Sequence, residues 1–89
     1  MATVHFTSHL QAFVNSEPVV VAAKDVAMAL ENAFEGREQL RSYVMDEHGR
    51  LRRHIMLFVD GKMVEDRVNL TDPVTEASEV YVMQALSGG

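Results

Sequence analysis

Short runs of alternating apolar and polar residues occur near both ends and in the middle of the chain. A period of two is typical of strands that bury one face. It predicts strands at Thr3–Thr7 and Glu79–Ala85, and the β-branched run Val19–Ala23 predicts another. Residues 53–66 are expected to form two further strands joined by a tight turn at Asp60-Gly61.

A different spacing follows Asp25, a residue type that favours a helix N-cap. The apolar residues here share one stripe of a helix: Val26, Leu30, Ala33 and Phe34. Gly36 has the position of a glycine just past a helix end. The pattern predicts one main helix at Val26–Glu35, and Glu38–Val44 adds a short helical turn that buries its apolar residues.

The order strand, strand, helix, strand, short strand, strand predicts one α+β domain, a mixed sheet of four to five strands packed on one main helix. The first and last strands would be central if they pair in parallel, which is the β-grasp arrangement. We expect residues 1–85 to form this domain and residues 86–89 to form a flexible tail that ends in Gly88-Gly89.

Period two also sorts the side chains of the longer strands into two faces. The aliphatic set, expected to face the helix, is Ile55, Leu57, Val59, Val80 and Val82. The opposite set contains Phe58, Tyr81 and Met83. One helix covers only one face. The opposite set therefore either forms an exposed docking surface or is covered by residues 37–53, which would fold over it.

Composition narrows the function. The 89 residues include no cysteine, which excludes disulfides, thiolate zinc sites and a cysteine nucleophile. The chain shows no leader pattern and no apolar run near the roughly 20 residues of a membrane span, so we expect a cytoplasmic protein without a membrane contact. The net charge of −5 argues against a nucleic-acid partner. Six acids after residue 59 would steer a basic protein partner toward that part of the chain.

No group of side chains points to catalysis or metal binding. The four histidines are scattered along the chain and do not predict a zinc site. The acids of the turns, among them Asp46, Asp60 and Asp66, have no evident apolar pocket that would shift a pKa. The basic run at residues 50–53 lacks the interleaved aromatic residues of a nucleic-acid site, so we expect a solvated, charged strand edge.

The stretch LFVDGKMVEDRVNLTD, at Leu57–Asp72, resembles the middle of ubiquitin without a gap. The segment GRLRRHIMLFVDG at Gly49–Gly61, the chain length and the terminal Gly88-Gly89 resemble the bacterial sulfur carriers of the ThiS/MoaD family. Within that family the chain is most similar to the carriers that deliver sulfur for cysteine or homocysteine. The resemblance covers essentially the whole chain and implies a ubiquitin-like β-grasp fold.

The resemblance implies a protein cosubstrate without catalytic residues, rather than an enzyme. An adenylating enzyme of the ubiquitin-activating type would use ATP to convert the Gly89 carboxylate into an acyl adenylate, and a sulfur donor would convert the adenylate into a thiocarboxylate. The carrier itself would bind no cofactor and no metal. Its other partners would be a sulfur-accepting biosynthetic enzyme and a processing metalloprotease that trims a longer precursor to Gly89.

The last residues suit this role for physical reasons. Gly88 and Gly89 lack side chains, so the backbone can enter a narrow site on another protein. Five extended residues, Ala85–Gly89, reach about 17 Å. Leu86 is the expected anchor of the tail. The positions that match the recognition patch of ubiquitin-like proteins are Phe58, Tyr81 and Met83.

Three alternatives remain open. A ubiquitin-like modifier would form isopeptide bonds with lysines through Gly89, and Lys24 and Lys62 are the only lysines available for self-conjugation. A small subunit of a molybdopterin-synthase-like complex would keep its tail inserted in a larger subunit. A structural or interaction domain with an inert tail would not need Gly88 and Gly89 for its function.

Overall fold

The computed structural model describes residues 1–7, 10 and 17–84 of the chain. The elements are β1 (Ala2–Phe6), β2 (Val19–Val21), α1 (Val26–Phe34), α2 (Glu38–Val44), β3 (Ile55–Val59), β4 (Lys62–Met63) and β5 (Glu79–Gln84). Their order is the predicted one, with boundaries that differ by one or two residues at β1, β2 and α1. The sequence also predicts a turn with some strand at Leu10–Asn15; residues 11–15 of it, and the tail at residues 85–89, lie outside the described residues.

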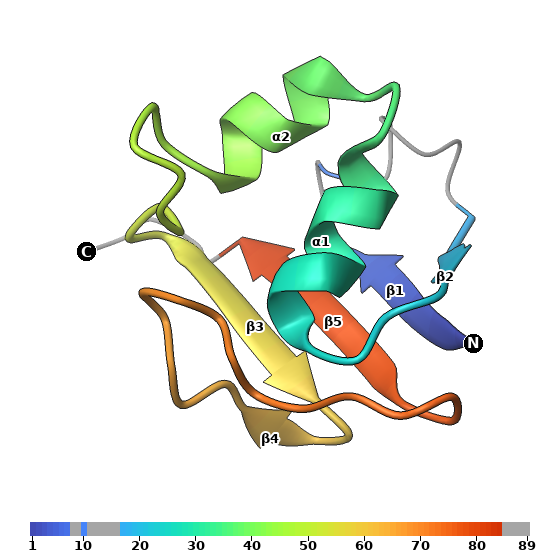
Figure 1. Ribbon diagram of the computed structural model, residues 1–89. Coiled ribbons are helices and arrows are strands. Elements are labelled where there is room, and N and C mark those ends of the chain that lie inside the picture. Colours follow the sequence, from blue (N-terminus) through green and yellow to red (C-terminus); the bar gives the residue numbers. More distant parts are fainter. Residues whose placement is uncertain (8–9, 11–16, 85–89) are drawn as a thin grey trace.

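The five strands form one sheet in the order β2-β1-β5-β3-β4. β1 and β5 pair in parallel, with Val4 opposite Val80, while the other neighbouring strands are antiparallel. The first and last strands therefore lie inside the sheet, and the predicted α+β arrangement is confirmed. Figure 1 shows β5 between β1 and β3, with the arrow of β3 pointing opposite to the other two.

Asp25 begins α1 as the sequence predicts. Its carboxylate accepts a hydrogen bond from the backbone N–H of Met28 at 2.8 Å, which satisfies one of the free donors of the first helical turn. Gly36 follows the end of the helix with φ of 75°, a left-handed conformation that glycine adopts without strain. The buried stripe of α1 consists of Val26, Ala29, Leu30, Ala33 and Phe34.

The apolar residues that alternate along the strands supply the sheet side of the core, opposite the α1 stripe. Leu57, Val80 and Val82 have no exposed surface and belong to the same apolar cluster as the α1 stripe. Burying one such side chain contributes about 1.5–3 kcal/mol, so the two faces of the sheet cannot be exchanged without a large loss of stability. The helix-facing set predicted from period two is confirmed for these strands.

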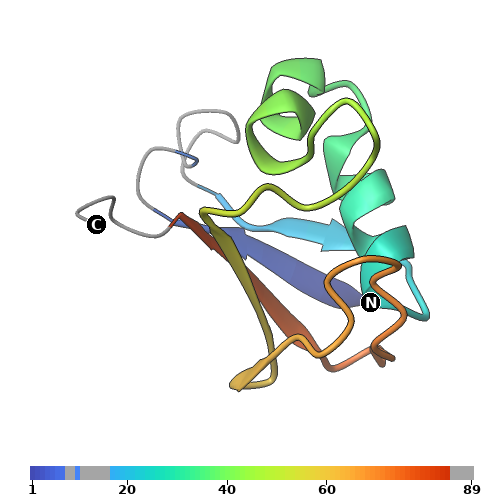
Figure 2. The same cartoon turned by 90° about the vertical axis from the view of Figure 1, so that its left-hand side faces the viewer.

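α2 and the segment after it pack on the same side of the sheet as α1, as Figure 2 shows. Leu40 and Val44 of α2 are fully buried, and Met45 and Leu51 of the following segment are nearly so. All four side chains join the core beneath α1. The alternative in which residues 37–53 fold over the opposite face of the sheet is therefore wrong, because the apolar side chains of this segment are used on the helix side.

Asp60 and Gly61 form the predicted turn between β3 and β4, with φ of 50° and 86°. Two consecutive positive φ values match the tight hairpin turns that follow strand twist. The Asp60 carboxylate also accepts hydrogen bonds from the backbone N–H of Glu79 at 2.9 Å and from the Ser78 hydroxyl at 3.1 Å. This side chain therefore ties the hairpin to the first residue of β5.

Candidate functional site

β3 and β5 carry an apolar face on the side of the sheet away from the helices. Phe58 lies opposite Tyr81, and Met56 lies opposite Met83. Residues that lie directly opposite on paired strands share one face. Tyr81 and Met83 are 38% and 37% exposed. The structure thus brings together the three sheet residues predicted to bind a partner, with Tyr81 and Met83 exposed and Phe58 partly buried.

The same face extends to both edges of the sheet. Met63 of β4 lies opposite Phe58 and is 51% exposed, and Val20 of β2 lies opposite Thr3 and is 60% exposed. The open apolar face, as we call it, consists of Val20, Met56, Phe58, Met63, Tyr81 and Met83. Its methionines have flexible, polarizable side chains that can adapt to different partner surfaces.

His5 adds a polar contact to this face. Its ring stacks on the Tyr81 ring with centroids 4.4 Å apart and planes 10° apart. Its Nε2 lies 2.5 Å from Oε1 of Glu79. The sequence interpretation counted His5 among four scattered histidines, surface or half-buried, that predict no zinc site. His5 alternates with the buried residues Val4 and Phe6 along β1, so its side chain points to the open side of the sheet. Only the parallel pairing of β1 with β5 sets it beside Tyr81.

The predicted reactive residues continue from this sheet. Gln84, the last residue of β5, lies opposite Ile55, the first residue of β3. Leu86, Gly88 and Gly89 lie outside the described residues, as does the boundary expected after residue 85. Their roles stay predictions. The structure does show at which end of the sheet the chain leaves β5.

Two of the turn acids hold loops together. The Arg50 backbone N–H is the main cause that lowers the pKa of the Asp46 carboxyl below its usual 3.8, and the His48 N–H adds to it. The Thr71 hydroxyl is the main cause that lowers the pKa of Asp66, followed by the Asn69 N–H. A lowered pKa keeps these groups ionised as acceptors, which suits a structural role rather than proton transfer at neutral pH.

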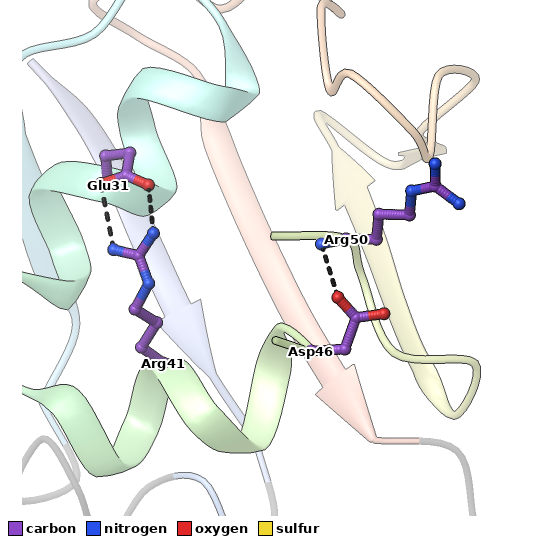
Figure 3. A network of polar contacts seen from close by, with 4 residues as sticks. All are labelled: Glu31, Arg41, Asp46 and Arg50. Carbon is purple, nitrogen blue, oxygen red and sulfur yellow. Dashed lines mark hydrogen bonds and ion pairs between the residues drawn. The ribbon is translucent and has the colours of Figure 1, made fainter. Parts of the chain in front are cut away.

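A hollow of about 640 Å³ lies between α1 and α2, lined by residues that include Glu31, Glu35, Glu38 and Arg41. Arg41 and Glu31 form a two-point ion pair across it, with Nη1–Oε2 at 3.1 Å and Nη2–Oε1 at 2.8 Å, as drawn in Figure 3. Within residues 1–7, 10 and 17–84, no group of three or more histidines or acids could hold a metal ion. We therefore interpret the hollow as part of the contact between α1 and α2.

The fold defined by these observations is the ubiquitin-like β-grasp. Parallel first and last strands lie inside a five-stranded mixed sheet, and α1 and α2 cover the same face of it. The resemblance predicted this fold, and the prediction is confirmed. None of the helices in the described part of the chain is long and apolar enough to span a membrane.

Solved structures with this fold match the chain over nearly its whole length. A chain of the Amycolatopsis orientalis BexX/CysO complex has a TM-score of 0.85 at 19% identity and 100% coverage of both chains. SAMP1 from Haloferax volcanii has a TM-score of 0.80 at 22% identity, with 99% of this chain and 98% of that chain covered. CysO from Mycobacterium tuberculosis has a TM-score of 0.82 at 16% identity, with coverage of 97% and 100%. Such identities show a shared fold.

No protein-family model matches the sequence, and no curated protein matches it.

Proposed function

We propose that this chain is a sulfur-carrier protein whose Gly89 carboxylate is converted to a thiocarboxylate. The observation that carries the proposal is the open apolar face on β3 and β5, because β5 is the strand that continues toward Gly88-Gly89. The whole-length likeness to CysO supports it, and the BexX/CysO complex gives a precedent for a protein partner of this fold.

The proposed chemistry has two steps. The Gly89 carboxylate attacks the α-phosphate of ATP, and pyrophosphate leaves, which gives an acyl adenylate. A sulfur donor then attacks the carbonyl carbon, and AMP leaves with its phosphate oxygen, so the carbon exchanges a C–O bond for a C–S bond. ATP is bound by the adenylating enzyme. The chain is the cosubstrate of this reaction and contributes only the reacting carboxylate.

Docking and reaction use different parts of the chain. Phe58, Tyr81 and Met83 are proposed to hold the adenylating enzyme through apolar contact, since buried aromatic and methionine side chains dominate many protein interfaces. Leu86 is proposed to anchor the tail. Gly88 and Gly89 then enter the active site, where a Cβ atom would obstruct the backbone.

The thiocarboxylate is a sulfur donor without a thiol side chain, which fits a chain that has no cysteine. We assign the sulfur to a biosynthetic enzyme that accepts it for a cofactor or an amino acid. The proposed location of this exchange is the cytoplasm.

Adenylation can be tested before any sulfur is present. The full chain and a variant that lacks Gly89 are each incubated with the cognate adenylating enzyme, ATP and labelled pyrophosphate. The proposal expects ATP–pyrophosphate exchange with the full chain and background exchange with the shortened one. Equal exchange for both chains would place the reacting carboxylate elsewhere and refute the proposal.

A second candidate function is a ubiquitin-like modifier. The likeness to small archaeal modifier protein 1, SAMP1, favours it, because that protein is named as a modifier. The same acyl adenylate would then pass to the ε-amine of a lysine and form an isopeptide bond. A ladder of larger species that carry this chain in a cell extract, lost when Gly89 is removed, would support the modifier over the carrier.

A further inference from the structure

Positive charge is concentrated beside the first residue of β3. Four of the eight lysines and arginines in the chain are Arg50, Arg52, Arg53 and Arg67, although the net charge is −5. The first three lie in the five residues that precede β3. Arg67 joins them because its Nη2 donates a hydrogen bond to the carbonyl oxygen of Arg52 at 3.1 Å. We call Arg52, Arg53, His54 and Arg67 the basic surface.

The basic surface makes no ion pair within 4.0 Å with a described residue, although the charge of Arg52 contributes to the lowered pKa of the Asp46 carboxyl. The ion pairs found among the described residues join other side chains. The neighbouring acids serve their own loops, since Asp46 accepts backbone hydrogen bonds from His48 and Arg50, and Asp66 from Val68 and Asn69. Figure 3 shows the Arg50 guanidinium pointing away from the Asp46 carboxylate. The positive charges are therefore not neutralised by ion pairs within the described fold.

Arg52 is held in a fixed orientation. Its Nε donates to the carbonyl oxygen of Ser42, near the end of α2, at 2.7 Å. Its two Nη atoms donate no hydrogen bond to any described residue. Arg52 also lines a pocket of about 320 Å³ together with Ser42, Tyr43 and His54. A guanidinium anchored through Nε, with both Nη groups available, is preorganised to take a carboxylate through two parallel hydrogen bonds.

The basic surface lies at the end of the sheet where the chain leaves β5. Ile55, which follows His54, is opposite Gln84. Acidic residues mark the other end, where Asp60 is bonded to the start of β5 at Glu79. The sequence suggested that the six acids after residue 59 attract a basic partner, but the structure places two of them, Asp60 and Glu79, at the end of the sheet away from the exit of β5.

The position of the basic surface constrains the partner. The five residues after Gln84, up to Gly89, span at most about 18 Å when fully extended. This step rests on the proposed function: an enzyme that reacts with Gly89 must come within that distance of Gln84, and hence close to the basic surface. Positive charge at such an interface would repel a partner surface that is itself basic. It lowers the binding affinity unless the partner supplies carboxylates.

We propose that the basic surface binds a carboxylate-rich segment of the adenylating enzyme, with an acidic side chain on the Nη atoms of Arg52 and an apolar neighbour in the pocket beside Tyr43 and His54. The segment borders the entrance through which the tail reaches ATP. This segment orients the carrier on the enzyme, because the acidic end of the sheet then faces away from the enzyme's carboxylates.

One arm of the test uses the chain alone. Hexaglutamate and inorganic phosphate are titrated separately into the isotope-labelled full chain, and backbone amide shifts are followed by NMR. The proposal expects hexaglutamate to shift the amides of Tyr43 and of residues 52–54, and Arg53→Glu to abolish these shifts. Shifts elsewhere, or none, would overturn it. An equal response to phosphate would make the surface a phosphate site and would also overturn it.

The second arm uses the adenylating enzyme. Arg53 is exposed and makes no ion pair with a described residue, so Arg53→Glu should leave the fold intact. Lys24→Glu makes the same charge change at an exposed site in the loop between β2 and α1. We expect Arg53→Glu to slow association about tenfold at low salt, with the difference shrinking at high salt, and Lys24→Glu to change it less than about twofold.

Circular dichroism of both variants checks that they fold. Equal association rates for the two charge reversals would refute the basic surface while leaving the carrier function intact. If Arg53→Glu slows association and Lys24→Glu does not, but the unmodified chain is not adenylated, the carrier function is refuted and the docking surface stays intact.

Discussion

The imidazole ring of His5 lies parallel to the phenol ring of Tyr81, 4.4 Å away across the β1–β5 pairing. The same imidazole reaches Glu79 through Nε2. One side chain of the first strand thus contacts two side chains of the last strand, 74 or more residues away in sequence. This contact fixes the Tyr81 ring within the open apolar face.

His5→Ala is expected to lower the free energy of unfolding by about 1 kcal/mol, because it removes a stacked cross-strand pair. His5→Phe keeps a ring on Tyr81 and should recover most of that loss. Urea denaturation followed by circular dichroism measures both. The control is His48→Ala, since the His48 side chain is 74% exposed and should not matter. Equal stability of all three variants would show that the stack contributes nothing.

Met83→Ala is expected to weaken binding to the adenylating enzyme about tenfold, or roughly 1.4 kcal/mol, because it removes an apolar contact at the centre of the open apolar face. Isothermal titration calorimetry measures the affinity. Met28→Ala is the matched control, because Met28 lies on α1 and is 40% exposed against 37% for Met83. The same loss in both variants would contradict docking through this face.

Leu57→Ala is expected to cost about 2–5 kcal/mol of stability, because Leu57 is fully buried between the sheet and the helices. Met56→Ala changes the adjacent residue, which faces the open side opposite Met83, and should cost less than half as much. Chemical denaturation of the two variants compares the faces directly. A larger loss at Met56 would mean that the helix side is not the main core.

Asp66→Asn is expected to destabilise the protein at neutral pH and to lower its melting temperature by a few degrees. Hydrogen bonding from Thr71 and Asn69 lowers the folded-state pKa of Asp66 below its usual 3.8. The stabilisation is therefore present above that value and is lost as the pH falls through the folded-state pKa.

The difference between Asp66→Asn and the unmodified protein should accordingly narrow from about pH 7 to about pH 3. Thermal melts at both pH values measure it. Glu65→Gln removes a neighbouring exposed charge and serves as the control. A difference that stays constant with pH would show that the Asp66 charge is not responsible.

Local patterns were sufficient to predict most of the fold. The Asp25 cap, the stripe of α1 and the strand faces all follow from short-range spacing, and the structure agrees. Leu40 and Val44 were expected to face inward, and they do. Such features depend on residues within one or two turns of each other, where intrinsic propensity and burial act together.

Long-range contacts could not be predicted in the same way. The position of His5 beside Tyr81 depends on pairing between the two ends of the chain. The link between Arg67 and Arg52 depends on how the segment after β4 returns past the start of β3. Spacing alone also left two places for residues 37–53, because their apolar side chains could fit either face of the sheet. Only packing against α1 decides between them.

Sulfur transfer to Gly89 is tested by the intact mass of the chain after incubation with the cognate adenylating enzyme, ATP and a sulfide source. A sulfur carrier is expected to show a mass increase equal to one oxygen-to-sulfur exchange, mapped by fragmentation to Gly89 and absent when Gly89 is deleted or ATP is omitted. An unchanged mass under conditions that support ATP–pyrophosphate exchange would contradict the sulfur-carrier function. So would an exchange that survives removal of Gly89.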